Sequence, residues 1–432
     1  MATERSAVGE DAGRPLRVAQ AAYALRCGGV GSILLDIGRE LTRAGFEVDL
    51  FATQERGGWF ERAAADAGMR AHAILRGELL SRAAHAVRVG RTLARLRYDA
   101  ILLHHCEPAQ AAMRLLPNRM AVFPVLHSPT EPMLRTGCAA RDAWNALIVP
   151  SERIEDAARM RAGSRPVVRI PHGVALDPSA LEQARAKKDR PLVLAYVGRV
   201  EEALKGVLLL PEILAQVQAA APSGRAARLR IAGDGPDAAR LREKARALGV
   251  ADSIDWLGEL DREAARNVYR GAHALLLASR IEGMSVSILE AQASGCVPIA
   301  TEIRGVTDQS VVPGRSGWLV PRDASAFARA VASVDADREG WLRMAAEAHR
   351  TVAERFTVER MGRDYANLVR DAAAGRYPLP RPRRRIFPLE PSLVGWKDYL
   401  PESARTVARR VRGGILGGGA PDERVREREG KG

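Results

Sequence analysis

Two glutamates separated by seven residues, Glu282 and Glu290, have the types and spacing to bind hydroxyl groups. The apolar run from His273 to Ser279 predicts a buried strand, and the apolar residues after Gly283 recur at helical spacing. A helix that begins near Ser285 presents free amides at its first turn, which suit an anion such as a diphosphate. Glu290 then lies roughly 7 to 8 Å along that helix, while Glu282 stays in the preceding loop. Because ionised carboxylates only accept hydrogen bonds, each could take a pair of neighbouring hydroxyls, one on a ribose and one on a sugar.

Taken alone, the two glutamates fit an ordinary surface equally well. Glu282 could be a solvated side chain at a helix entrance, and Glu290 could lie on an exposed helix face. Gly283 would let the backbone approach a ligand, and Ser285 and Ser287 are suitable helix caps. The interpretation therefore depends on phosphate-binding groups elsewhere in the chain.

Two cations follow a predicted strand earlier in the same half of the chain. The strand within residues 192–200 runs into Gly198 and Arg199, and Lys205 with Gly206 begins the next helical stretch. A guanidinium and an ammonium near the carboxyl end of a strand suit a diphosphate. An exposed loop cation is the more frequent explanation for Arg199 in so basic a chain. Lys205 is one of only six lysines and is less easily explained in that way.

Three other strand ends carry glycine or histidine. Gly233 and Gly235 lie between a predicted strand and a helix, where they could admit a nucleotide, although this turn pattern is weak in isolation. Gly29 and Gly31 follow the first strand but do not form the dinucleotide motif. His127 ends the fifth predicted strand. A histidine in such a place is more often structural, and His127 is the best-placed candidate for a functional one.

The composition narrows the class of protein. The 432 residues are too many for one ordinary core and predict two domains with a tail. A formal net charge of +14 is compatible with nucleic acid, a membrane or an anionic substrate. Aromatic residues make up only 5% of the chain, and no stacking pattern for bases is present, so we expect no nucleic acid as partner. The four cysteines have no CxxC spacing, which predicts neither disulfides nor a zinc site and favours a cytoplasmic location.

The predicted strands fall into two series. The first comprises residues 17–21, 46–52, 70–75, 100–105, 121–127 and 146–151, and the second 192–200, 228–233, 253–258, 273–279 and 297–303. Helical patterns separate most of them, so each series predicts an α/β domain with a doubly wound parallel sheet that binds ligands at the carboxyl ends of its strands. The polar segment 177–191 is the expected linker. Two such domains joined by a hinge imply a site in the cleft between them.

The chain is accordingly divided into four parts. We expect a disordered N-terminal tail (1–14), an N-terminal Rossmann-like domain (15–182), a C-terminal Rossmann-like domain with terminal helices (183–375) and a Pro/Arg-rich basic tail (376–432). The tail begins with a proline-rich stretch, which forbids a regular helix, and continues into an amphipathic helix at residues 400–416. This helix and the arginine-rich segment 76–97 could each lie on an anionic membrane surface, which would place the protein at the inner face of a membrane. Packing against the protein body is the alternative for both.

Together these features resemble the retaining, GT-B-fold glycosyltransferases of family 4. The motifs that carry the resemblance occur in the family's order between Leu16 and Gly375: GGVG, the strand-ending His127, PHGV, VGR with KG, GDGP, WLG and EGMSVSILEA. The resemblance implies two Rossmann-like domains facing a central cleft, with the acceptor on the first, the donor on the second and the last helix crossing back to the first. Family members transfer a sugar from a UDP- or GDP-sugar to a hydroxyl acceptor, such as a glycan, a glycolipid or a small metabolite. They use no essential metal or other cofactor.

Carried over by position, the resemblance assigns a role to each of these residues. Arg199 and Lys205 would hold the donor diphosphate, Glu282 the transferred sugar and Glu290 the ribose, while His127 would contact the sugar from the opposite domain. The other donor-binding positions would be Gly29, Gly31, Gly198, Gly233, Gly235, Leu257, Gly283, Met284, Ser285 and Val286.

The implied mechanism is departure of the nucleoside diphosphate, eased by the cations and the helix amides, with the acceptor hydroxyl entering on the same face. No residue presents itself as a covalent nucleophile. Many family members have a small aromatic-glycine step after the first glutamate, where this chain has Met284 and Ser285, so the donor is undetermined by the motif.

Other interpretations stay open from the sequence. Two-domain sheets of this kind also host nucleotide-sugar epimerases and phosphorylases. A non-catalytic nucleic-acid-binding protein is the other class and rests on charge alone. The only D-x-D triplet, Asp335 to Asp337, could bridge a metal to a diphosphate, but its place before a late helix favours a helix cap.

Overall fold

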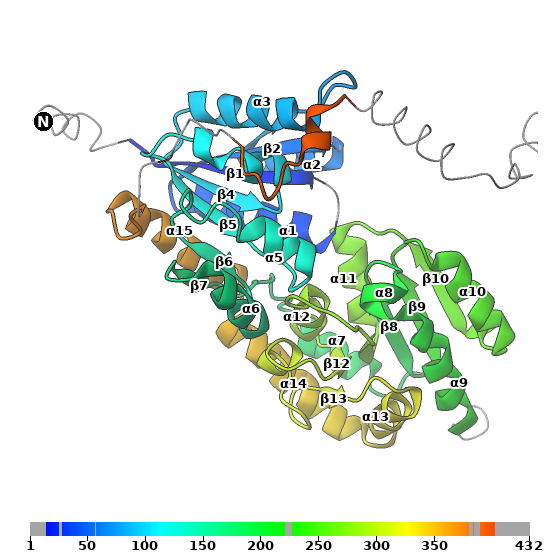
Figure 1. The fold of residues 1–432 in the computed structure, drawn as a ribbon. Coiled ribbons are helices and arrows are strands. Elements are labelled where there is room, and N and C mark those ends of the chain that lie inside the picture. The colour runs from blue at the N-terminus through cyan, green and yellow to red at the C-terminus, as the bar shows by residue number, and fades with distance from the viewer. Residues whose placement is uncertain are drawn as a thin grey trace, which may run out of the picture.

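The computed structural model describes residues 14–25, 28–56, 58–220, 227–379, 383 and 389–401, which form two α/β domains stacked one on the other (Figure 1). Both sheets are parallel, so the predicted fold of two Rossmann-like domains is confirmed. The predicted N-terminal tail up to residue 13 and the tail helix from residue 402 onward lie outside the described residues.

The first sheet has seven strands in the order β3-β2-β1-β4-β5-β6-β7. They are β1 (Arg17–Leu25), β2 (Glu47–Arg56), β3 (Arg70–Ala73), β4 (Ala100–His104), β5 (Ala121–Val125), β6 (Leu147–Val149) and β7 (Val167–Arg169). The connecting helices are α1 (Gly29–Arg43), α2 (Gly58–Asp66), α3 (Arg82–Arg95), α4 (Glu107–Ala111), α5 (Glu131–Gly137) and α6 (Glu152–Ala162). β4 and β5 are buried along their whole length, because helices cover both faces of the sheet.

The second sheet has six strands in the order β10-β9-β8-β11-β12-β13. They are β8 (Val193–Val197), β9 (Arg228–Ala232), β10 (Ile254–Gly258), β11 (Ala274–Leu277), β12 (Val297–Thr301) and β13 (Trp318–Val320). The helices around it are α7 (Ala180–Lys187), α8 (Glu202–Lys205), α9 (Leu210–Ala220), α10 (Ala238–Ala247), α11 (Arg262–Gly271), α12 (Val286–Ala293), α13 (Ala324–Ala336) and α14 (Arg338–Arg355). The edge strands β7 and β13 are not predicted from the sequence, because three residues are too few to establish a pattern.

The predicted linker segment contains the packed helix α7. Ala180 and Ala184 of α7 are buried, and the buried Lys187 donates a hydrogen bond to the carbonyl of Arg270 at 2.9 Å. The predicted cap in the D-x-D triplet is confirmed, because Asp337 accepts a hydrogen bond from the Gly340 amide at 2.7 Å at the start of α14.

Helix α15 (Val358–Ala373) leaves the second domain and packs on the first (Figure 1). Met361 and Tyr365 belong to the core of the first domain. Gly362 allows close contact with α1, because a β-carbon there would lie 2.2 Å from Cβ of Glu40. The crossing helix therefore ties the two domains together at a place remote from the predicted linker.

Beyond α15, the described part of the tail packs against the first domain. The buried Arg383 donates from Nε to the carbonyl of Ala143 at 2.9 Å and from Nη2 to that of Met120 at 3.0 Å. Residues 389–401, here called the C-terminal strap, run beside α3 and α4 and include the short helix η5 (Trp396–Tyr399) (Figure 1). The Glu390 carboxylate pairs with Arg114 at 2.6 Å. These residues of the predicted basic tail are thus part of the folded body.

The segment 76–97, predicted to be amphipathic, contains α3, whose apolar residues are buried. Ala83 and Ala86 pack with Leu389 and Leu393 of the strap. The apolar face of α3 therefore contacts protein and is covered. No helix among the described residues is long and apolar enough to cross a membrane.

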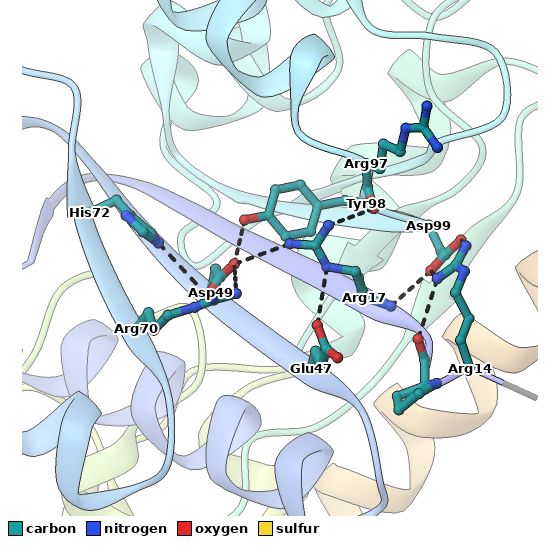
Figure 2. A network of polar contacts seen from close by, with 10 residues as sticks. Arg14, Arg17, Glu47, Asp49, Arg70, His72, Arg97, Tyr98 and Asp99 are labelled. Atoms are coloured by element: carbon teal, nitrogen blue, oxygen red, sulfur yellow. Dashed lines mark hydrogen bonds and ion pairs between the residues drawn. The ribbon is translucent and has the colours of Figure 1, made fainter.

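A polar network closes the amino ends of the first sheet (Figure 2). The buried carboxylate of Asp49 accepts hydrogen bonds from Arg70 Nε at 2.8 Å and from the Tyr98 hydroxyl. Burial alone would raise the pKa of Asp49, but the hydrogen bonds from Arg70 and Tyr98 bring it below 3.8. The network lies at the edge opposite to the strand ends that bind ligands in this architecture, so we assign it to stability.

Candidate active site

The loop after β11 brings Glu282 against Lys205. The Lys205 Nζ lies 2.8 Å from Oε1 of Glu282, and the Ser279 hydroxyl donates to the same oxygen at 2.6 Å. Glu282 is buried, with 6% of its surface exposed. The amide of Arg280 donates to the carbonyl of Leu204 at 2.8 Å, so the backbone also joins the loop to α8. The sequence predicts one residue for a phosphate and the other for a sugar, and the structure places the two in direct contact.

Gly206 makes this contact possible. Its φ is 61°, in the left-handed region, and a β-carbon there would lie 2.3 Å from the carbonyl oxygen of Ala278 at the end of β11. The Lys-Gly step thus holds α8 against the strand end from which the Glu282 loop departs.

Two helix N-termini face each other next to this loop. Helix α12 begins after Ser285, as predicted, and α1 begins after Gly28. A β-carbon on Gly29 would lie 4.0 Å from Cβ of Val286, so the first residues of the two helices meet across the cleft. The Ser285 hydroxyl contacts that of Ser287 at 3.1 Å and makes no capping hydrogen bond to the backbone. Because the partial positive charges of both helices point to one place, the arrangement suits an anion.

The first domain contributes a buried chain of histidines. His127 Nε2 lies 3.0 Å from His104 Nδ1, and His104 Nε2 lies 3.1 Å from Oε1 of Gln20. The Gln20 amide nitrogen donates to the carbonyl of Leu34, so its oxygen must accept from His104. The order of donors then assigns the proton of His127 to Nε2 and leaves Nδ1 as an acceptor. No described residue forms a hydrogen bond with this Nδ1.

These histidines are neutral at physiological pH. Burial lowers the pKa of His104 to about 3 and that of His172 to about 4, and it lowers the pKa of His127 well below its usual value. The rings of His127 and His172 stack with centroids 5.4 Å apart. A neutral His127 can accept a hydrogen bond from a hydroxyl but adds no charge to the site.

A glycine is needed at position 283 for a structural reason that the sequence does not reveal. A β-carbon at Gly283 would lie 1.9 Å from the carbonyl oxygen of His127, so the glycine permits contact between the two domains. Met284 is also buried there, and its sulfur accepts a hydrogen bond from the His172 amide at 3.2 Å. The step after Glu282 therefore packs against the first domain.

The glycine-containing turns that follow β8 and β9 pack closely against each other. A β-carbon on Gly233 would lie 1.9 Å from the carbonyl oxygen of Gly198, and one on Gly235 would lie 2.3 Å from that of Val200. Close packing of these two turns accounts for both glycines without a ligand. Arg199 extends from the same turn and its side chain is 64% exposed, with Nε 3.1 Å from Glu201.

Glu290 lies on α12, at a small space that it shares with Arg262 and Tyr269. Glu290 is half-buried, and the Tyr269 hydroxyl donates to it at 3.2 Å. Burial raises the pKa of Glu290, although the nearby Arg262 opposes that shift. The space beside Glu290 measures about 10 Å³, enough for about one water molecule and too small for a ribose. Leu257 is partly exposed on β10.

Two residues beside Glu290 are missed by sequence reasoning. The guanidinium of Arg262 forms a bidentate pair with the buried Asp36 of α1, at 2.7 and 2.6 Å. This ion pair joins the two domains at the rim of the site. Charged residues on two separate helices give no signal in one sequence that they meet.

Comparisons with known proteins identify the family that this chain resembles. Residues 27–178 match the family model described as Glycosyltransferase Family 4, and residues 191–337 match that of Glycosyl transferases group 1. A D-inositol 3-phosphate glycosyltransferase of Mycolicibacterium smegmatis is 29% identical over 309 residues, which cover 68% of this chain and 67% of that protein. A glycogen synthase of Mycobacterium tuberculosis is 31% identical over 200 residues, which cover 46% of this chain and 47% of that protein.

Solved structures agree on the fold. HepE of Anabaena, determined in complex with UDP and glucose, superimposes with a TM-score of 0.68 at 19% identity. The superposition covers 82% of this chain and 99% of HepE.

Proposed function

The chain belongs to the glycosyltransferases of family 4, and we propose that it transfers a sugar from a nucleotide-sugar donor to a hydroxyl acceptor with retention at the anomeric carbon. The observation that supports this proposal most is the contact of Lys205 with Glu282 beside the facing N-termini of α1 and α12. A cation, a carboxylate that can accept hydrogen bonds from hydroxyls, and the free amides of two helix N-termini are thereby gathered in one cleft.

In this mechanism the donor diphosphate lies against the adjacent N-termini of the two helices. Lys205 and the amides stabilise the charge that develops on the leaving phosphate. Glu282 accepts hydrogen bonds from hydroxyls of the transferred sugar, and its contact with Lys205 places that sugar next to the phosphate. His127 offers its neutral Nδ1 to another hydroxyl from the opposite domain. The acceptor hydroxyl then attacks the anomeric carbon from the face that the leaving phosphate occupied, as the bond from that carbon to the phosphate oxygen breaks, and the departing phosphate takes up the hydroxyl proton.

We propose a UDP-sugar as the donor and no metal requirement. UDP was found in the structure of HepE, which shares this fold. Lys205 and Arg199 supply positive charge that a metal ion would otherwise provide at a diphosphate. Among the described residues, no group of three or more His, Cys, Asp or Glu is placed to hold a metal ion.

The test is a transfer assay with UDP-glucose, UDP-N-acetylglucosamine and GDP-mannose as donors and a panel of glycans and polyols as acceptors. We expect an α-linked product from an α-linked donor, identified by its proton coupling in NMR, and an undiminished rate in excess EDTA. A β-linked product would contradict retention, and loss of turnover in EDTA that Mg²⁺ or Mn²⁺ restores would contradict metal independence. Conversion of the donor sugar without transfer would support the alternative of a nucleotide-sugar epimerase.

Binding of the segment 400–416 to a membrane is a separate proposal, based on the arginine-rich amphipathic helix that its sequence predicts. Sedimentation of the protein with anionic vesicles at low salt tests it. Protein that stays in the supernatant would contradict it.

A further inference from the structure

A second cavity, of about 200 Å³, lies at the carboxyl edge of the first sheet. Its walls come from the ends of β1 and β2, from α3 and α4, and from the C-terminal strap. Its polar lining includes Tyr23, Gln54, Arg82, His85, Glu107 and Asp398. Glu107 begins α4, directly after the strand that carries His104, so the cavity and the histidine chain share one edge of the sheet.

One buried nitrogen atom among the residues that line this cavity lacks a hydrogen-bond partner. His85 is 1% exposed, and its Nε2 lies 2.9 Å from the carbonyl oxygen of Thr53. Because a carbonyl can only accept, Nε2 carries the proton and Nδ1 is left as an acceptor. No described residue contributes a donor to this buried Nδ1. Burial lowers the pKa of His85, so the ring remains neutral and keeps this acceptor.

The strap is held firmly enough to form a wall. The Glu390 amide donates to the carbonyl of Ala111 at 2.8 Å, and its carboxylate pairs with Arg114 at 2.6 Å. Leu393 is buried and also lines the cavity, as does Val394. The cavity therefore exists only when the chain end is docked on α3 and α4.

The lining indicates the chemistry of the ligand. Arg76 and Arg82 are balanced by Glu107 and Asp398, so the formal charge of the lining sums to zero. Donors and acceptors are mixed, and Tyr23 adds a ring that is 43% exposed. The volume is larger than a cavity of roughly 150 Å³ that takes a benzene and below the roughly 300 to 1,000 Å³ of pockets for drug-sized molecules. Such a cavity fits one neutral ring that carries hydroxyl groups.

We propose that this cavity binds a monosaccharide or cyclic polyol unit of the acceptor, with a hydroxyl of that unit donating to Nδ1 of His85. The inference rests on the proposed transferase function, and it makes the C-terminal strap part of the acceptor site. The donor site, which lies across the cleft on the second domain, is independent of the strap.

Two variants of the full-length protein test the proposal. His85→Gln keeps an amide nitrogen that can donate to the Thr53 carbonyl but removes the acceptor at Nδ1. Val394→Trp fills the cavity from the strap. Arg88→Gln, on an exposed position of the same helix α3, is the matched control. We expect each cavity variant to raise the KM for the acceptor by about threefold to tenfold, the range that corresponds to one lost hydrogen bond. Affinity for UDP-glucose and its slow hydrolysis without acceptor should stay within about twofold of wild type.

Direct binding separates this inference from the transferase proposal. Saturation-transfer NMR titrations with glucose, mannose, N-acetylglucosamine and myo-inositol should detect binding to the wild type and the control, and the affinity should be weaker by about threefold to tenfold in both cavity variants. An unchanged acceptor KM in both variants, with donor affinity intact, would overturn the inference. Binding of glucose 6-phosphate without binding of glucose would contradict the proposal that the ligand of the cavity is neutral. If the wild type neither binds nor transfers from nucleotide sugars, the transferase proposal fails, and weaker monosaccharide binding in His85→Gln would still establish the cavity as a sugar site.

Discussion

At the scale of single residues, the contact of Lys205 with Glu282 determines how the site can work. The buried Glu282 is held by Lys205 and by Ser279, so its carboxylate is fixed before a sugar arrives. Replacement of Lys205 by alanine removes the cation that we propose to contact the leaving phosphate. It also removes one of the two hydrogen-bond donors to Glu282.

We expect Lys205→Ala to lower kcat by about two orders of magnitude, because one well-placed charge is worth roughly 3 kcal/mol in such a transition state. Steady-state transfer from UDP-glucose measures the effect. Lys188→Ala is the matched control, because Lys188 pairs with Glu339 on the surface. Turnover of Lys205→Ala equal to that of the control would exclude the assigned role.

The buried histidines predict a dependence of stability on pH. Their folded pKa values lie below the usual 6.5, so the folded state favours neutral rings and binds fewer protons than the unfolded state. Stability is then complete above about pH 6.5 and falls as the pH drops toward the folded values of about 3 and 4. Each such histidine lowers the free energy of unfolding by roughly 1.4 kcal/mol for each pH unit of that fall.

Urea unfolding at pH 7 and at pH 5 measures this loss. His104→Gln can keep a hydrogen bond to Gln20 without a titrating ring. It should reduce the pH dependence of the free energy of unfolding by about the contribution of one histidine. An identical pH dependence in wild type and variant would contradict the assignment to His104.

The sequence predicts where the candidate site residues lie along the chain, but it does not give the structural reason for several of its glycines. Motif order placed Glu282, Lys205 and His127 at strand ends that the fold brings together. The sequence cannot tell whether a glycine admits a ligand or another backbone. Gly283 faces the His127 carbonyl, and Gly233 faces that of Gly198, so both are explained by contacts between loops distant in the sequence.

At the scale of elements, the loop before α12 acts as a contact between domains. We expect Gly283→Ala to push this loop away from His127, because its β-carbon would lie 1.9 Å from a backbone oxygen that cannot give way. Transfer should fall by at least about tenfold, and thermal unfolding should occur at a lower temperature. Gly77→Ala, where nothing lies within 4 Å of the added carbon, is the control and should behave as wild type. Wild-type activity in Gly283→Ala would show that this close contact is not needed.

The helices and strands also show what a pattern in a single sequence can predict. Alternating strands and helices predicted both sheets, because each buried strand is continuous in the sequence. The same pattern missed the edge strands β7 and β13. It also treated the end of the chain as a separate tail, although Arg383 and the strap are packed on the first domain. Such packing depends on carbonyl groups and side chains more than 200 residues earlier in the chain.

At the scale of the whole molecule, the contacts that join the domains include α15, which packs on α1, and the ion pair of Asp36 with Arg262. The ion pair lies beside Glu290, where there is room for about one water molecule. If the donor ribose binds to Glu290 as proposed, we expect it to displace Arg262 and so to weaken the ion pair.

Weakening the ion pair tests this coupling. We expect Asp36→Asn to speed association of a UDP-sugar by several-fold in stopped-flow fluorescence, because less Coulomb energy opposes displacement of Arg262. The variant should also be less stable by about 3 kcal/mol, since it leaves a partly buried arginine without its carboxylate. Asp36→Asn combined with Arg262→Gln should recover part of that stability while association stays fast. Slower or unchanged association in Asp36→Asn would mean that the donor enters without disturbing the ion pair, and Glu290 would then lose its proposed contact with the ribose.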